Sequence, residues 1–141
     1  MTPQEITNSL QNFKDRRDDL MHEDVNGFDH LAGRFIEFCE KDFLIQTILN
    51  PLKERFSDIN AEQWWEAVQQ GYEIPDFPLD KDEELILRYK ILQSVRGDRG
   101  ILFEFGRLCS HSKLDEATES FRSLVLRPLM SELFPTARRS R

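Results

Sequence analysis

The side chains of this chain that could bind a metal ion gather in one short stretch. Histidines and acids occur there as His22, Glu23, Asp24, Asp29 and His30. A metal site needs several such side chains on one face. His22 and Asp29 are seven residues apart and would align on a continuous helix, but Asn26-Gly27 predicts a break between them. We therefore expect a polar corner between two helices and no metal site.

The only cysteine close to a histidine in the sequence is Cys109, two residues before His111. A reactive thiol needs solvent access and a lowered pKa. Cys109 instead falls on the apolar stripe of a predicted helix, as Cys39 does, so both are expected to be buried free thiols. The six glycines are scattered, and no glycine-rich phosphate loop occurs. These patterns predict neither nucleophilic catalysis nor a cofactor.

Segment 17–22 is a candidate catalytic motif, which begins with Arg17 and ends with His22. The segment has an arginine, a polar residue, three further residues and then a histidine. This spacing is similar to the motif of the all-α HEPN ribonucleases. The resemblance implies a metal-independent ribonuclease acting as a dimer, in which Arg17 and His22 of paired subunits form a composite site. There, histidine would move the 2′-hydroxyl proton and arginine would stabilise the charged phosphorane.

Two features of this segment differ from the HEPN pattern. The motif ends the first predicted helix, whereas in that family it usually lies late in the domain. Asp18 and Asp19 lie inside it and would repel a phosphate backbone. The ribonuclease is therefore the alternative function and not the leading one.

Length and charge narrow the class of protein. The 141 residues suit one domain that can fold without metal or disulfide. The net charge of −7 makes nucleic acid an unlikely partner, because a polyanion would be repelled. Apolar runs reach only three residues, so we expect no membrane span. With a polar N-terminus and free cysteines, the expected location is the cytoplasm.

Helical periodicity is the dominant pattern, and no segment alternates with period two. Helix starts are indicated by capping residues: Thr2 with Glu5, Asp42, Asn60 with Gln63, and Asp80. The predicted helices cover about residues 3–23, 28–41, 43–56, 61–71, 81–96, 101–109 and 114–134. We therefore predict an all-α fold, a single bundle of six to seven helices whose third and last helices are kinked by proline.

The proline of the third helix lies in segment 48–52, whose sequence Ile-Leu-Asn-Pro-Leu is echoed by Val-Leu-Arg-Pro-Leu at 125–129. Pro51 cannot donate a hydrogen bond to the carbonyl of Thr47 and crowds it. Either the helix kinks there, or Asn50 caps a fresh turn; the sequence leaves both open. An ancient duplication and chance explain the match between the two segments about equally well.

The last predicted helix contains a proline and is followed by another. Pro128 should kink it near Leu124, four residues earlier. Pro135 should end it. We accordingly expect a helical domain over residues 1–134 and a short basic tail over 135–141.

Aromatic residues around the fourth helix are the candidates for partner binding. A helix this short need not bury both Trp64 and Trp65, and an exposed tryptophan often anchors a contact. Alternatively, Trp65 packs under the apolar loop that holds Tyr72 and Phe77. The predicted partner-binding residues are Trp65, Tyr72 and Phe77. Acids at the start of the fifth helix would suit a basic partner or simply be solvated.

Aromatic and proline positions follow one another in a distinct order along residues 30–134: Phe35, Phe38 and Cys39, then Phe43-Leu44-Ile45, Asn50-Pro51-Leu52, Trp64-Trp65, Leu85 to Leu92, Phe103 to Phe105, Phe121, and Arg127-Pro128-Leu129. This order resembles helical accessory modules attached to bacterial abortive-infection and other antiphage effectors. The resemblance implies assembly or sensing rather than catalysis, and it assigns no functional residue.

Together these observations favour a non-catalytic all-α module for protein–protein association in the bacterial cytoplasm. Its expected partner is another protein or a second copy of the chain, and no cofactor is expected. The HEPN-like ribonuclease is the competing function.

Overall fold

The computed structural model describes residues 2–22, 25–71, 76–95 and 114–139. Within these ranges every regular element is helical and none is a strand. The elements are α1 (Pro3–His22), α2 (Val25–Lys41), α3 (Phe43–Arg55), α4 (Ala61–Gly71), α5 (Lys81–Ser94), α7 (Leu114–Phe121), a π-helical turn (Arg122–Leu126) and α8 (Arg127–Arg139). The predicted all-α class is thereby confirmed.

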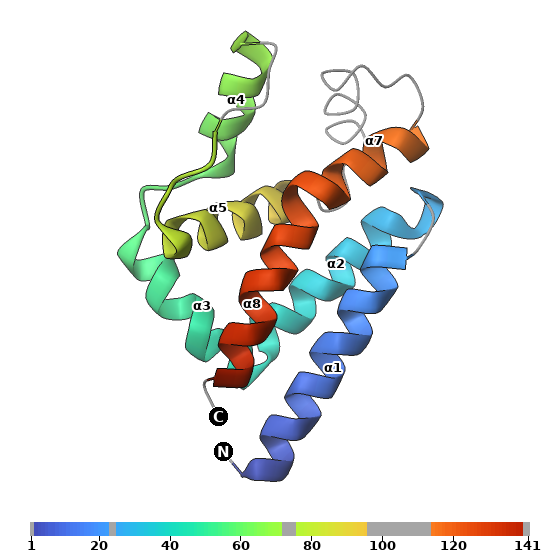
Figure 1. Cartoon of the computed structure of the whole chain (residues 1–141), viewed down its shortest axis with the longest axis vertical. Coiled ribbons are helices and arrows are strands. Elements are labelled where there is room, and N and C mark those ends of the chain that lie inside the picture. Colours follow the sequence, from blue (N-terminus) through green and yellow to red (C-terminus); the bar gives the residue numbers. More distant parts are fainter. Residues whose placement is uncertain (1, 23–24, 72–75, 96–113, 140–141) are drawn as a thin grey trace.

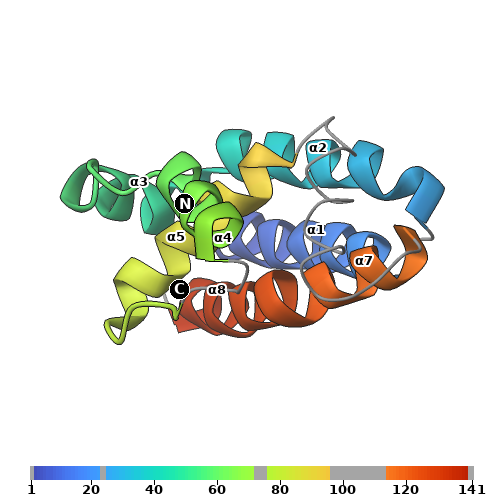
Figure 2. The same ribbon diagram turned by 90° about the horizontal axis from the view of Figure 1, so that it is seen from above.

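Most of the helices pack against α5, and α1 packs against α2 and α8 instead (Figures 1 and 2). α1 runs antiparallel to α2, and the long run from α7 to α8 contacts both of them. α5 crosses the molecule and contacts α2, α3, α4, α8 and the π turn. α4 lies at one end of the molecule and packs against α5. No described helix has the length and apolar character needed to cross a lipid bilayer.

The predicted helix starts are confirmed by their capping hydrogen bonds. Backbone N–H groups donate to the side chains of Thr2, Asp42, Asn60 and Asp80, at distances of 2.8 to 3.1 Å. Each bond satisfies a donor that has no partner within the helix itself. Local sequence alone therefore defines where α1, α3, α4 and α5 begin.

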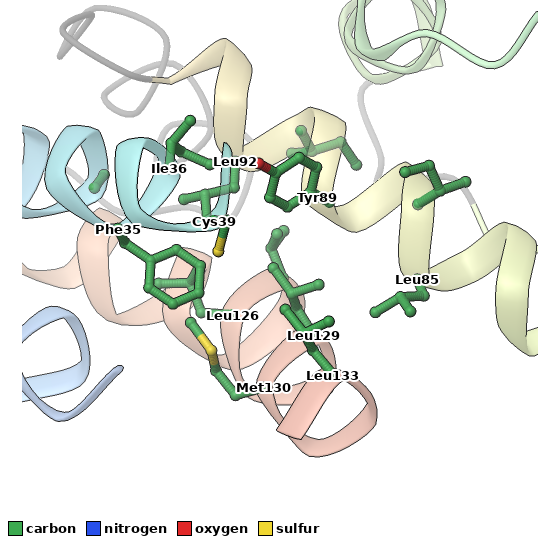
Figure 3. Close-up of a cluster of buried hydrophobic side chains, with 14 of the residues drawn as sticks. Phe35, Ile36, Cys39, Leu85, Tyr89, Leu92, Leu126, Leu129, Met130 and Leu133 are labelled. Atoms are coloured by element: carbon green, nitrogen blue, oxygen red, sulfur yellow. The ribbon is translucent and has the colours of Figure 1, made fainter. Parts of the chain in front are cut away.

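All the helices from α1 to α5, and the run from α7 to α8, contribute to one hydrophobic core, and Figure 3 shows the part of it between α2, α5 and the α7–α8 run. Phe35 and Cys39 of α2 lie beside Tyr89 of α5 and Leu126 of the π turn, and all four residues are fully buried. Burial, together with neighbouring carboxylates, raises the pKa of the Cys39 thiol. Cys39 is therefore an unreactive core thiol, as its position on the apolar stripe predicts. Cys109 lies outside the described residues.

A break does separate the helices that hold His22 and Asp29, but it precedes Asn26-Gly27, because α1 ends at His22. α2 begins at Val25 and includes both residues. A glycine in a helix costs about 1 kcal/mol relative to alanine. Phe28 and Ala32, in the next turns of the same helix, are buried, and their packing outweighs this local preference.

Pro51 lies inside α3, which is continuous from Phe43 to Arg55. Asn50 is an internal helical residue, so the fresh-turn alternative is wrong. The kink predicted at Pro51 stays a prediction.

The C-terminal helical run differs from the prediction at Pro135, whereas the kink predicted near Leu124 from Pro128 stays a prediction. A π-helical turn precedes Pro128, and the Arg127 N–H donates to the carbonyl of Arg122. The helix also continues through Pro135 to Arg139, so the predicted end at Pro135 is wrong. Pro135 leaves the carbonyl of Ser131 without its usual donor, but Ser131 is exposed and water can replace that donor. The helix predicted over 101–109 lies outside the described residues.

Candidate functional site

A groove of about 300 Å³ lies where α4, the first half of α5 and the segment before α5 meet. We call it the α4–α5 groove. Its lining consists of Asp58, Ile59, Asn60, Gln63, Trp64, Pro78, Glu83 and Leu87. It thus combines an apolar floor with polar and acidic side chains.

Two helix starts position the lining of the α4–α5 groove. The Asn60 side chain accepts a hydrogen bond from the Gln63 N–H at 2.8 Å and sets the first turn of α4, which carries Trp64. Asp80 caps α5 in the same way. One turn separates Glu83 from Leu87 on α5, so the two lie on the same face.

A lysine ties the α3–α4 connection to α5. The Lys90 ammonium donates to the carbonyls of Phe56 and Ile59. Burial lowers the pKa of Lys90, and the nearby Asp58 carboxylate opposes that shift. This contact keeps Ile59 beside the α4–α5 groove.

Aromatic rings form the interior wall next to the α4–α5 groove. Trp64 is only 6% exposed, and its ring lies edge-on to Trp65 at 4.8 Å and 5.9 Å from Phe77. The Arg88 guanidinium lies 3.6 Å from the centre of the Phe77 ring. Trp65 is half-buried, and its indole N–H donates to Ser94 Oγ at 2.8 Å. These rings hold α4, α5 and the segment before α5 together.

Leu79 is fully exposed and directly follows the groove residue Pro78. Among the described residues, only Phe43, at 68% exposure, is a second large apolar side chain left in solvent to a comparable extent. A scattered exposed leucine needs no explanation, but one beside an apolar groove enlarges a single contact surface.

The structure brings two of the three predicted partner-binding residues to this region. Trp65 and Phe77 both contact Trp64, whereas Tyr72 lies outside the described residues. Their role in binding stays a prediction. Leu79 and Leu87 were missed as site residues. Leu87 does not lie on the apolar stripe of α5. An apolar residue off that stripe could have been recognised in the sequence as a candidate for the site.

The Arg17 and His22 pair is placed at the C-terminal end of α1. Both Nε and Nη2 of Arg17 donate to Asp18 Oδ1 at 3.2 Å. His22 is the last residue of α1, and its side chain lies outside what is described. The ribonuclease alternative stays a prediction.

No three histidine, cysteine, aspartate or glutamate side chains within the described part of the chain are arranged to hold a metal ion. Glu23 and Asp24 of the sequence candidate fall outside that part.

A second polar cluster surrounds Glu40 of α2. Its carboxylate accepts hydrogen bonds from Lys53 of α3 at 2.8 and 2.9 Å, and from Tyr89 and Gln93 of α5 at 2.6 and 3.2 Å. Burial alone would raise the pKa of Glu40, but the hydrogen bonds from Lys53 and Tyr89 and the Lys53 charge lower it. With four hydrogen bonds directed at one carboxylate, this cluster joins three helices, and we assign it a structural role.

The candidate site is the α4–α5 groove, which combines apolar and polar side chains and lies beside the exposed Leu79. Comparisons of the chain with protein-family models, curated proteins and solved structures found no match.

Proposed function

We propose that this chain is a non-catalytic helical module that binds a protein partner, or a second copy of itself, through the α4–α5 groove. The observation that carries this proposal is Leu79, a fully exposed leucine next to a groove floored by Ile59, Trp64 and Leu87. Burying one such side chain contributes about 1.5–3 kcal/mol. Leu79 would enter the partner while an apolar side chain of the partner enters the groove.

The charge of the groove defines the partner further. Asp58 and Glu83 are the ionisable residues of its lining, and both are acidic. A lysine or arginine next to the partner's apolar anchor would complement them and favour the correct register. A role in bacterial antiphage defence, as a cytoplasmic assembly or sensing module, rests on the resemblance of the helical pattern alone.

Site-specific photo-crosslinking tests this proposal in cells that express the full chain. A photoreactive residue at position 79 should give one discrete product, either a crosslinked dimer or one partner identified by mass spectrometry. The same residue at the exposed position 43 serves as the matched control and should not give that product. A photoreactive residue at the exposed Asp76, two residues before the lining residue Pro78, gives a second crosslinking position. The Glu83→Lys substitution in the groove should abolish the crosslink formed from it.

Sedimentation velocity of the purified chain supplies the second measurement. If position 79 gives no discrete product and the chain sediments as a single monomer at all soluble concentrations, the association proposal is wrong.

The competing ribonuclease predicts a different result. Purified chain would cleave RNA without added metal, and Arg17→Ala or His22→Ala would remove that cleavage. The observation against it is that the Arg17 guanidinium is already bound to Asp18. RNA cleavage that disappears with either substitution would replace the association module as the function.

A further inference from the structure

A second pocket, separate from the α4–α5 groove, lies between α1 and the C-terminal half of α2. Its volume is about 380 Å³. Its lining consists of Arg16, Arg34, Glu37, Phe38, Lys41 and Asp42. We call it the Arg16–Arg34 pocket, and it shares no residue with the α4–α5 groove.

Three of the charged side chains in the Arg16–Arg34 pocket are already engaged. Lys41 Nζ lies 2.7 Å from the Glu37 carboxylate, one turn away on α2. The Asp42 carboxylate accepts the hydrogen bond from the Ile45 N–H that caps α3. Both acids of the lining therefore have other partners.

The two arginines are not neutralised in this way. Arg16 Nε is buried with no acceptor among the described residues. Arg34 is exposed and has neither a hydrogen bond nor an ion pair to any of them. A buried donor without an acceptor costs about 1–3 kcal/mol. Two guanidinium groups that face one pocket also repel each other. This arrangement is unexpected in a chain with 26 acidic and 19 basic residues, where carboxylates are plentiful.

We propose that the Arg16–Arg34 pocket binds the carboxylate of a small aromatic or apolar ligand. The carboxylate would accept hydrogen bonds from the guanidinium groups of α1 and α2, in the geometry that arginine forms with planar oxyanions. Phe38, which is half-buried in the lining, would contact the apolar part of the ligand.

The net charge of the pocket lining favours binding of a carboxylate over binding of a phosphate monoester. Three bases and two acids give the lining a net charge of +1. A singly charged anion neutralises this lining, whereas a doubly charged phosphate would leave it with a net charge of −1. The volume is within the range of small-ligand pockets, about 300–1,000 Å³.

Titration of the full chain with sodium benzoate, at constant ionic strength, tests this proposal by NMR. The guanidinium resonances of Arg16 and Arg34, which both line the pocket, should shift to saturation as these groups gain an acceptor. Neutral benzamide should cause no such shift, and phenyl phosphate should bind more weakly than benzoate.

Two variants of equal charge change separate the pocket from general electrostatics. Arg34→Gln should weaken benzoate binding by about tenfold or more, the usual effect of losing a charged hydrogen bond. Arg55→Gln, on an exposed ion pair with Asp82, should leave binding unchanged. Because Arg34 is exposed, its substitution should leave the fold intact.

Three results would overturn the assignment: no saturable shift with benzoate, equal binding of benzamide, or equal effects of Arg34→Gln and Arg55→Gln. Tighter binding of phenyl phosphate than of benzoate would overturn the choice of a carboxylate.

Discussion

Pro51 in α3 and Pro128 in α8 occupy matching sequence segments, but the protein accommodates them differently. Pro51 is exposed, and Thr47, whose carbonyl loses its usual donor, is exposed too. Pro128 is half-buried and follows a π-helical turn. The carbonyl of Leu124, four residues before it, accepts a hydrogen bond from Arg88 Nη1 at 3.1 Å.

The difference shows that the cost of a helix proline depends on what faces the freed carbonyl. Water can satisfy an exposed carbonyl without help from the protein. A carbonyl that faces the interior needs a donor from elsewhere in the chain. Arg88, 36 residues away in sequence and 7% exposed, supplies it while pairing with Glu84 at 3.2 Å.

Replacing Arg88 is expected to have the largest effect on stability. Arg88→Met keeps much of the apolar stem but removes the hydrogen bond to Leu124, the ion pair with Glu84 and the contact with Phe77. We expect a loss of about 2–4 kcal/mol in the free energy of unfolding, because an inward-facing carbonyl is left unsatisfied. Urea denaturation measures this loss.

The matched control is Arg127→Met, which removes an exposed arginine from the neighbouring turn. Its ion pair with Glu119 lies at the surface, and such pairs contribute about 0–1 kcal/mol. Equal losses for the two variants would show that Arg88 does not compensate for Pro128.

The two prolines should also respond differently to alanine. Pro51→Ala restores a donor and removes a steric clash, so we expect the free energy of unfolding to rise by about 1–2 kcal/mol, part of the cost of a helix proline. Pro128→Ala should change it by less than about 1 kcal/mol, because Arg88 already bonds to Leu124.

Urea denaturation of both variants tests the contrast directly. A gain from Pro128→Ala as large as that from Pro51→Ala would contradict it. The double variant Arg88→Met/Pro128→Ala should recover part of the loss, since the backbone N–H that alanine restores at position 128 can donate to the Leu124 carbonyl.

The smallest expected effect concerns Glu40. Its side chain is 37% exposed, so its carboxylate is reached both by water and by donors from the protein. Its pKa is lowered in the folded chain. Its contribution to stability is therefore present above the unfolded pKa of about 4.3 and is lost as the pH falls through the lower folded pKa.

Denaturation at a series of pH values below neutral tests this effect. Glu40→Gln should reduce the fall in stability toward acidic pH, and Tyr89→Phe should cost about 1 kcal/mol near neutral pH. Glu54→Gln, on the exposed side of α3, is the control, because it changes the net charge by the same amount as Glu40→Gln. An unchanged acid slope in Glu40→Gln would show that the cluster adds no pH-dependent stability.

Much of the helical architecture could be predicted from the sequence, because its signals are local. Thr2, Asp42, Asn60 and Asp80 each define a helix start through a hydrogen bond within the next few residues. Predictions failed where a helix continued through a residue that locally disfavours it: α2 includes Gly27, next to the buried Phe28, and α8 continues through Pro135, where water can replace the lost donor. The α4–α5 groove was not predicted from the sequence, because a groove depends on how separate helices meet. Trp65 and Phe77, which were named for partner binding, contact its lining residue Trp64, and that role stays a prediction.

Spacing along the chain and contacts within a few residues were sufficient to specify the all-helical class, the helix starts and the buried thiol of Cys39. The packed fold was needed to establish that Arg88 compensates for Pro128, that Glu40 joins three helices, and that Arg16 and Arg34 face one pocket. These contacts join residues on different helices, and their distances follow from packing rather than from spacing along the chain.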